Sequence, residues 1–266
     1  MILKNKKALI TGGSGAIGKT TAEFFEREGC EVITASRSGN YSVDIASPES
    51  VKTLMNLVEK KFGSLDILVT AAGTYGEIGS LEQCDAEKWL DAIKVNLYGM
   101  MLSIKYALPM LKKNGNGKII AFAGGGDAPL PNFTSYASSK GAVLRLVESL
   151  SKEFSDFGIE INAISPGLVN SGLTRDLVEA GAEKAGKDQY EAALKQTKGE
   201  MKTVSPEKAA ELAVFLASGK SNGITGKNIS AVWDKWQEFS NHLEKLKQSD
   251  IYNWRRIKPE DRGYDW

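Results

Sequence analysis

The sequence predicts an α/β protein: a single doubly wound domain with a mostly parallel, seven-stranded sheet and helices on both faces. Short apolar or β-branched runs alternate with longer amphipathic segments along the 266 residues, and this alternation favours helical crossovers between parallel strands. A glycine-rich turn, Thr11 to Gly18, joins the first apolar run to the first amphipathic segment. No composition shift or linker divides the chain, so we expect one domain over residues 1–266.

Each predicted strand is short and apolar, and most helices have a start or stop signal. The strands are expected over residues 7–11, 31–36, 41–45, 66–73, 118–123, 159–165 and 227–232. The helices are expected over 17–28, 48–62, 85 to about 109, 134–157 and from Ser205-Pro206-Glu207 onward. Ser47 before Pro48, and Asp85, are N-cap residues. The second and third strands are too close in sequence for a helical crossover.

Composition excludes several classes of partner. Lys and Arg number 34 against 33 Asp and Glu, so no charge imbalance favours nucleic acid or an anionic membrane. Two cysteines suit a reducing compartment, and no apolar run is long enough for a secretion signal or a bilayer span. We therefore expect a cytoplasmic protein. His242, the only histidine, lies in a Lys/Glu-rich segment, so no histidine-based metal site is predicted.

The glycine-rich turn contains the first chemical signal. Its pattern, Gly13-x-Gly15-x-x-Gly18, fits a dinucleotide-binding fingerprint placed between a strand and a helix. Glycines let the backbone approach a pyrophosphate, whose charge meets free N–H groups at the helix start. The alternative is a turn kept for packing. On the dinucleotide-binding reading, the cofactor contacts predicted in this turn are Gly12, Ser14, Gly15, Ala16, Ile17 and Gly18.

Tyr136-Ala137-Ser138-Ser139-Lys140 contains the second signal. Residues four apart lie on one face of a helix, so the Tyr136 phenol and the Lys140 ammonium can approach the same ligand. A nearby positive charge is expected to lower the tyrosine pKa toward working pH, which suits a general acid/base. The alternative is an ordinary amphipathic helix.

These motifs, with Asn96 and Pro166-Gly167, resemble those of the short-chain dehydrogenase/reductase family from residue 6 to about residue 232. The resemblance implies a Rossmann-type fold and an NAD(P)(H)-dependent oxidoreductase that transfers hydride between nicotinamide and a secondary alcohol or ketone. It assigns proton exchange to Tyr136, ribose binding to Lys140 and a water-mediated proton relay to Asn96. Further cofactor contacts are implied for Asp44, Ile45, Ala71, Ala72, Gly73, Asn96, Tyr136, Lys140, Pro166, Gly167 and Val169.

The chain departs from the family pattern at three places. The turn has Ala16 where a glycine is common, a spacing more typical of the sugar-nucleotide branch, and Thr70-Ala71 replaces two asparagines. Ala123 stands where the family has a serine that hydrogen-bonds the substrate carbonyl. Losing such a donor costs about 10²–10³ in rate, so activity can survive with Thr134 or a water as the replacement. A weakened or non-catalytic dinucleotide-binding member, and a sugar epimerase or dehydratase, remain open.

The end of the second strand bears on cofactor choice. It reads Ser36-Arg37-Ser38, without the acidic residue that binds a free ribose diol. Because an arginine suits a 2′-phosphate, NADP(H) is favoured over NAD(H). The alternative is that Arg37 is a solvated surface charge.

Two further segments carry expectations. Residues 172–204 are polar with glycines at 172, 181 and 186, and are predicted to be a mobile lid over the substrate, with a static helical insert as the alternative. The tail, 233–266, holds four of five tryptophans, which favour an anchor or subunit interface over stacking on sugars. Its sequence resembles relatives associated with bacterial surface-sugar pathways, a pointer to a sugar or sugar-nucleotide substrate.

The resemblance also implies a homodimer or homotetramer, because the long helices after the fourth and fifth strands pair across a twofold axis in the family. Leu102, Tyr106, Leu144 and Val147 can supply the apolar faces for this pairing. A role within the core is the alternative for the same side chains.

Overall fold

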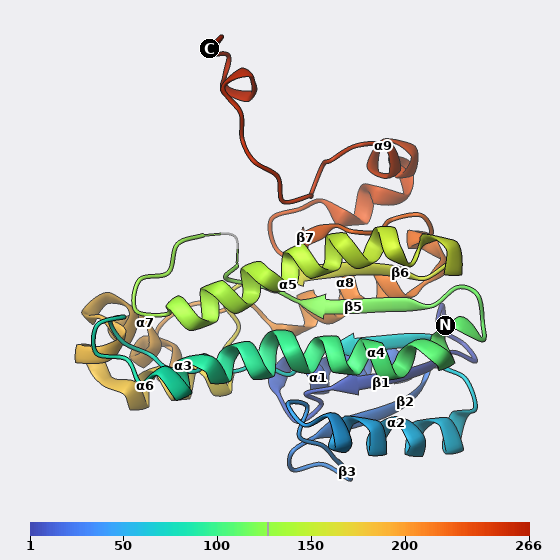
Figure 1. Ribbon diagram of the computed structural model, residues 1–266, viewed down its shortest axis with the longest axis horizontal. Coiled ribbons are helices and arrows are strands. Elements are labelled where there is room, and N and C mark those ends of the chain that lie inside the picture. Colours follow the sequence, from blue (N-terminus) through green and yellow to red (C-terminus); the bar gives the residue numbers. More distant parts are fainter. Residues whose placement is uncertain (127) are drawn as a thin grey trace.

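The computed structural model describes residues 1–126 and 128–266 and contains one seven-stranded sheet (Figure 1). Its strand order is β3-β2-β1-β4-β5-β6-β7, and every neighbouring pair is parallel. The strands are β1 (Lys7–Thr11), β2 (Glu31–Ser36), β3 (Tyr41–Ser42), β4 (Ile67–Thr70), β5 (Lys118–Phe122), β6 (Glu160–Ser165) and β7 (Asn228–Ser230). The predicted α/β fold class and the strand count are confirmed.

Helices cover both faces of the sheet. The helices are α1 (Ala16–Arg27), α2 (Pro48–Phe62), α3 (Ala86–Ala92), α4 (Gly99–Lys112), α5 (Thr134–Glu153), α6 (Gly172–Ala185), α7 (Lys187–Thr197), α8 (Pro206–Ala217) and α9 (Leu243–Gln248). Helices α1 and α8 pack with one face in one apolar core, while α2, α4 and α5 pack with the other face in a second core. The predicted caps are confirmed: the Ser47 side chain accepts from Ser50 N–H, and Asp85 accepts from Glu87 and Lys88 N–H.

Several predicted elements differ from the structure, among them the seventh strand, which covers Asn228–Ser230 instead of 227–232. The third strand has two residues instead of five, because beyond Ser42 the chain turns and Asp44 N–H donates to Ser50 Oγ at 3.0 Å. The fourth strand is also shorter than predicted. The helix expected over 85 to about 109 is divided by a π-helical turn, Ile93–Tyr98, and α4 continues through Pro109 to Lys112. Pro109 has no N–H for the hydrogen bond to the Lys105 carbonyl, and α4 ends within one turn of it.

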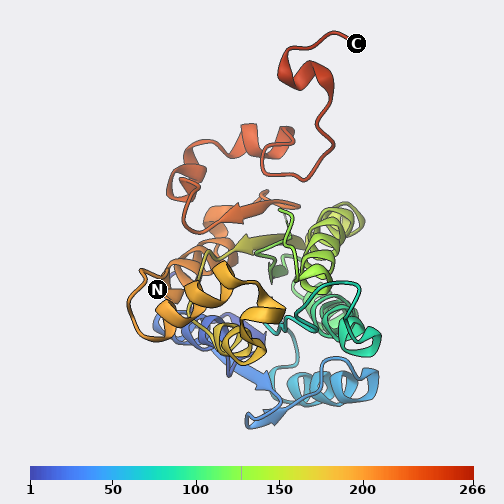
Figure 2. The same cartoon turned by 90° about the vertical axis from the view of Figure 1, so that its left-hand side faces the viewer.

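The polar insert forms α6 and α7, which are joined at Gly186 with φ +86°. Gly181 inside α6 has φ +79°, so this helix is bent where an L-amino acid would be strained. Figure 2 shows the two gold helices lying across the carboxyl ends of the strands. The insert is therefore placed over the edge of the sheet where the predicted site residues gather.

The tail first packs against the body and then leaves it (Figure 1). Trp236 is buried, with its ring centroid 5.7 Å from that of Phe215. Beyond α9 the tail covers the edge of the sheet, where Asn228 N–H donates to Tyr252 O at 2.8 Å. Trp254 then lies on α5, where the Arg145 side chain donates to its carbonyl oxygen at 2.6 Å. These contacts give Trp236 and Trp254 the anchoring role expected for the tail.

The side chains expected at a subunit interface are used inside the chain. Leu102, Leu144 and Val147 are buried in the core between the sheet and its helices, and Tyr106 packs against that core. The alternative role within the core is therefore the one that the structure shows for these residues. Self-association stays a prediction that rests on the family resemblance alone.

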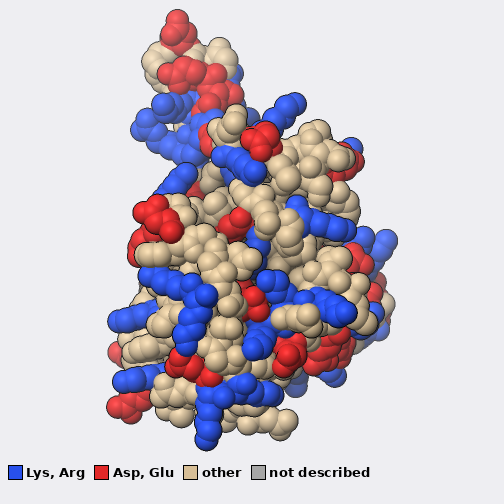
Figure 3. Space-filling view, turned by 90° about the vertical axis from the view of Figure 1, so that its right-hand side faces the viewer, with Lys and Arg blue, Asp and Glu red and all other residues tan. Residues whose placement is uncertain are grey.

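The surface shows no large region of one charge in the view of Figure 3, at the amino ends of the strands. Lysines and acids are paired there, for example Lys6 with Asp66 at 3.0 Å and Lys113 with Glu59 at 2.8 Å. Within residues 1–126 and 128–266, no helix is both long and apolar enough to span a membrane.

Candidate active site

The predicted site residues gather at the carboxyl edge of the sheet, beside the point where the strand order reverses. From β1 the chain goes outward to β2 and β3, then returns to β4 on the other side of β1. Such a reversal leaves a crevice between the loops that follow β1 and β4, and ligands of open α/β sheets bind there. The glycine-rich turn follows β1, and Ala71 to Gly73 follow β4.

The glycine-rich turn fits a pyrophosphate. Gly12 has φ +76°, and a Cβ on it would lie 2.4 Å from Ala72 N, so the two loops approach more closely than a side chain allows. A Cβ on Gly18 would lie 2.4 Å from Gly12 O. Gly15 is the N-cap of the 12-residue α1 and offers no side-chain cap. The N–H groups of the first turn, from Ala16 to Gly18, are thus free to meet an anion, with Ser14 exposed beside them.

The end of β2 separates a buried and an exposed side chain. Ser36 is buried, whereas Arg37 is exposed. Asp44 is also exposed, and its carboxylate accepts from Ala46 N–H at 2.9 Å in a local turn. Ile45 is buried beside it. This end of the crevice therefore offers the exposed guanidinium of Arg37 and an apolar floor at Ile45, with Asp44 at the rim.

Asn96 lies in the π-helical turn and is fully hydrogen-bonded. Its Oδ1 accepts from Thr74 N–H at 2.9 Å, and its Nδ2 donates to Thr74 O at 2.9 Å and to Ser139 Oγ at 2.8 Å. π-Turns inside helices commonly mark functional sites, since they free a backbone carbonyl. Asn96 therefore fastens the loop after β4 to α5.

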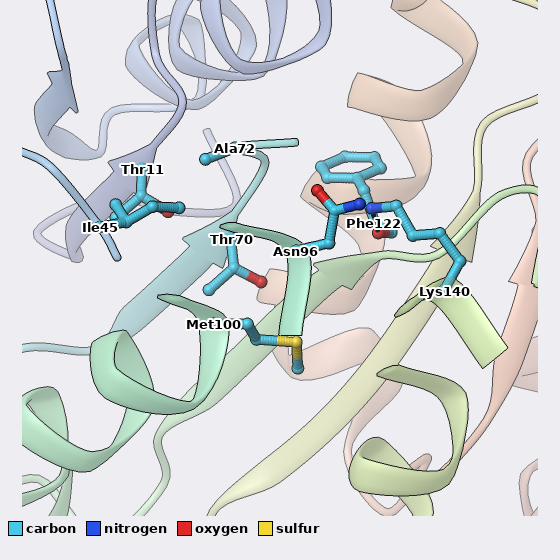
Figure 4. A pocket seen from close by; sticks show the side chains of 8 residues that line it. All are labelled: Thr11, Ile45, Thr70, Ala72, Asn96, Met100, Phe122 and Lys140. Atoms are coloured by element: carbon cyan, nitrogen blue, oxygen red, sulfur yellow. Dashed lines mark hydrogen bonds between the residues drawn. The ribbon is translucent and has the colours of Figure 1, made fainter. Parts of the chain in front are cut away.

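A small cavity connects the predicted cofactor and catalytic residues (Figure 4). Figure 4 shows the Asn96 and Lys140 side chains directed toward each other. A Cβ on Gly73 would lie 3.3 Å from Asn96 Oδ1 and 3.7 Å from Lys140 Nζ, so a side chain there would crowd this meeting point. The Thr70 hydroxyl has no hydrogen-bond partner within the described residues. The lining residues are Thr11, Ile45, Thr70, Ala72, Asn96, Met100, Phe122 and Lys140.

Tyr136 and Lys140 lie on one face of α5, as the spacing predicts. Lys140 Nζ is 5.8 Å from the centroid of the Tyr136 ring and donates to Phe122 O at 2.7 Å. The Tyr136 hydroxyl donates to Gly124 O at 3.0 Å. Both side chains thus donate to carbonyls of β5 and the loop after it.

The expected lowering of the tyrosine pKa is wrong for this state of the site. Burial, and secondarily the charge of Tyr75, raise the pKa of Tyr136 above its usual range. Burial lowers the pKa of Lys140 to about 8. Desolvation outweighs the attraction between the two groups, so the phenol is protonated at neutral pH.

The three glycines after β5 are functional residues that the sequence reading missed. Gly125 has φ +88°, and a Cβ on it would lie 2.8 Å from Tyr136 Cε1. A Cβ on Gly126 would lie 2.4 Å from Lys140 C, in the backbone of α5. The loop can therefore lie against α5 and offer the Gly124 carbonyl to Tyr136. Three consecutive glycines, Gly124 to Gly126, are the sequence signal for this close approach.

No side-chain hydroxyl stands in for the missing serine. Ala123 is fully buried after β5, with its N–H donating to Ile164 O. The Thr134 hydroxyl accepts from the Trp89 indole at 3.0 Å, and Ser135 Oγ donates to Tyr75 O at 2.9 Å. Neither is hydrogen-bonded to Tyr136 in the structure.

The remaining predicted contacts follow β4 and β6. Ala71 N–H donates to Thr11 O at 3.0 Å and continues the sheet register. Pro166 packs against Gly124, where a Cβ would lie 3.0 Å from Pro166 Cδ, and Gly167 has φ +80°. Val169 is buried next to them. Ala71 therefore lies beside the glycine-rich turn, whereas Pro166, Gly167 and Val169 follow β6, two strands further along the sheet.

Helices α6 and α7 close the crevice from outside. Leu177 of α6 is buried in an apolar cluster that also contains Tyr136. Lys184 forms an ion pair with Glu77 at 3.2 Å. Burial, and then the charge of Glu179, raise the pKa of Asp176. Arg175 and Arg37 are near enough to oppose this rise in the pKa of Asp176. We keep the name lid for the polar insert, residues 172–204, which contains these two helices, and its mobility stays a prediction.

We expect trypsin to cleave the lid at Lys184 and Lys187 more slowly when NADPH and a substrate analogue are bound together. As a mobile lid, this insert would open to admit ligands and close again over a filled site. Arg255 and Arg262 lie in residues 255–266, the part of the tail that projects from the body (Figure 1) and that we call the projecting arm. Cleavage at these two residues serves as the internal control and should not change. Equal lid cleavage with and without ligands would contradict a moving lid.

Comparison with known proteins identifies the family. Residues 13–231 match the family model described as enoyl-(acyl carrier protein) reductase. The chain therefore belongs to the short-chain dehydrogenase/reductase family, whose members bind NAD(P), and it is an oxidoreductase of that family.

Individual relatives cover most of the chain. The cyclohexanol dehydrogenase of Acinetobacter sp. strain SE19 is 28% identical over 241 residues, covering 84% of this chain and 91% of that protein. The ligand-free aldohexose dehydrogenase of Thermoplasma acidophilum superposes with a TM-score of 0.75 at 27% identity, covering 86% of this chain and 92% of that chain. ElxO with NADP bound superposes with a TM-score of 0.73 at 29% identity, covering 85% and 96%.

Proposed function

We propose that this chain is an NADP(H)-dependent oxidoreductase that interconverts a secondary alcohol and a ketone. The observation that carries the proposal is the placement of Tyr136 and Lys140 on one face of α5, next to Asn96 and the free helix N-terminus of the glycine-rich turn. The alcohol carbon loses a hydride to NADP⁺, the alcohol oxygen loses a proton, and ketone and NADPH result. The names of two relatives, a cyclohexanol dehydrogenase and an aldohexose dehydrogenase, support testing ring alcohols, including sugars, as substrates.

In this proposal Tyr136 is the proton carrier. Its raised pKa keeps the phenol protonated, so in the reductive direction it is ready to donate to a carbonyl oxygen. The substrate oxygen would take the place of Gly124 O as the acceptor of this hydrogen bond. Lys140, whose pKa of about 8 lies in the working range, would hold ribose hydroxyls and exchange a proton with solvent through the Asn96 region.

The cofactor would be held by the crevice residues described above. Bound NADP(H) supplies the hydride. The N–H groups of Ala16 to Gly18 would bind its pyrophosphate, and Arg37 would pair with its 2′-phosphate. Ser36 and Arg37 offer no carboxylate for a free ribose diol, which supports NADP(H) over NAD(H).

We expect Arg37→Ala to weaken NADPH binding by about 10-fold or more and NADH binding by less than about 2-fold, since a charged hydrogen bond to phosphate is lost only with NADPH. Titration of both cofactors, followed by protein fluorescence, measures this. Arg262→Ala, on the exposed projecting arm, is the control and should change neither affinity. Equal affinities for the two cofactors, unaffected by Arg37→Ala, would contradict the cofactor assignment.

The experiment that tests the proposed reaction is steady-state turnover with NADPH against a panel of cyclic, aryl and acyl ketones, and with NADP⁺ against the matching alcohols and sugars. Stoichiometric conversion of NADPH and ketone is the expected result. Absence of turnover across the panel, together with absence of cofactor binding, would overturn the proposed function.

A further inference from the structure

We infer that the substrate is a ring or aryl secondary alcohol or ketone whose reacting carbon has apolar neighbours, and not a sugar or sugar nucleotide. This inference rests on the proposed function, because it concerns the alcohol that Tyr136 would act on. Its basis is an apolar cluster over Tyr136 that is separate from the two cores on the sheet faces. We call it the lid cluster, formed by Tyr75, Ile78, Leu130, Phe133 and Leu177 around Tyr136.

The lid cluster surrounds Tyr136 from three directions. Tyr75 and Ile78 come from the loop after β4, Leu130 and Phe133 from the loop after β5, and Leu177 from α6. Although each segment is separate in sequence, each presents an apolar or aromatic side chain to this place. A molecule that reaches the Tyr136 hydroxyl therefore contacts the apolar side chains of the lid cluster.

The aromatic rings set the shape of the cluster. The Tyr75 ring lies edge-on to Tyr136, with centroids 4.8 Å apart and an interplanar angle of 69°. Phe133 lies 5.2 Å from Tyr75 at 59°. Edge and face arrangements of this kind accept a further flat or cyclic apolar group.

The two hydroxyl groups that directly precede Tyr136 in the sequence are already engaged. Thr134 accepts from Trp89, Ser135 donates to Tyr75 O, and the segment from Ala123 to Gly126 has no hydroxyl. A sugar would bury several hydroxyls against this surface, and each one left unpaired would lower affinity by about 10-fold or more. The same surface would favour an apolar ring.

Charged groups lie at the rim of the lid cluster. Lys184 on α6 and Glu77 in the loop after β4 form an ion pair of 3.2 Å. Asp176, also on α6, is close enough for its charge to raise the pKa of Tyr75, after burial. An apolar centre with a polar rim is the usual construction of a small-molecule site.

The test compares cyclohexanol with D-glucose, two six-membered rings that differ in their hydroxyls, as substrates with NADP⁺. We expect kcat/KM for cyclohexanol to exceed that for glucose by at least about 10²-fold, the loss for two or more unpaired hydroxyls. Leu177→Asn should lower kcat/KM for cyclohexanol by about 10-fold and leave glucose unchanged, because only the apolar ring loses a contact. NADPH affinity is measured in parallel to show that the variant is folded.

The control variant is Leu57→Asn, on the exposed side of α2 and away from the site. It should change neither kcat/KM. Turnover of glucose that equals or exceeds that of cyclohexanol would overturn the inference while the proposed reaction stands. Turnover of neither ring, with ketones of the wider panel reduced, would also overturn it. No reduction of any panel member and no cofactor binding would instead refute the proposed function.

Discussion

Replacing Tyr136 by phenylalanine should lower kcat by about 10²–10⁴-fold, the usual contribution of a positioned general acid/base. The ring contacts with Tyr75 and Gly125 would remain, and the only hydrogen bond lost is the one to Gly124 O. Affinity for NADPH should therefore stay nearly unchanged. The measurement is kcat on the best panel substrate together with the dissociation constant for NADPH.

Tyr190→Phe is the matched control. Tyr190 packs in the same apolar cluster from α7, but it has no place in the proposed proton transfer. Its loss of a hydroxyl should leave kcat within about 2-fold, the size of an ordinary surface or rim substitution. Full turnover by Tyr136→Phe would show that the chemistry lies elsewhere.

Ala123→Ser is expected to raise kcat by up to about 10²-fold, because a hydroxyl there can donate to the developing charge on the substrate oxygen. Among the described residues, no side-chain hydroxyl is hydrogen-bonded to the Tyr136 phenol in its place, since Thr134 and Ser135 have other partners. The backbone of Ala123 is fixed by the hydrogen bond to Ile164, so the new side chain would stand at a defined position.

The control for this gain is Ala121→Ser, two residues earlier on β5. Ala121 is fully buried in the same core and on the same side of the strand, but further from the carboxyl edge. It should lower stability without raising kcat. If neither wild type nor Ala123→Ser turns over any panel substrate while NADPH still binds, the chain is a non-catalytic dinucleotide-binding member of its family.

The fold could be predicted because its signals are local. Each strand is an apolar run between polar or glycine residues, and Ser47, Asp85 and Ser205 mark helix starts within three residues of the groups they cap. The third strand was predicted too long because two residues suffice to pair with β2, and nothing in its composition reveals where pairing stops.

For the candidate site, the sequence predicts which residues share an element, but not what their side chains contact. Spacing placed Tyr136 and Lys140 on one face, yet their partners are backbone carbonyls of Gly124 and Phe122, which carry no sequence signature. The sequence predicts a lowered pKa for Tyr136, whereas burial raises it, and this error has the same origin. Burial by Tyr75 and the lid depends on segments far apart in the chain, and desolvation cannot be read from a five-residue motif.

The pairing of Tyr252 with Asn228 has a consequence for how the protein is made. An uncovered edge strand is a template on which another chain can add, and here the cover comes from the final part of the sequence. During synthesis β7 leaves the ribosome before this segment, so it stays open until the residues around Tyr252 have followed. A chain cut short just before Ser249, by a stop codon or a protease, would therefore keep its candidate site but leave the edge of β7 open to pairing with another chain. Such a product should form aggregates at concentrations where the full chain stays dispersed.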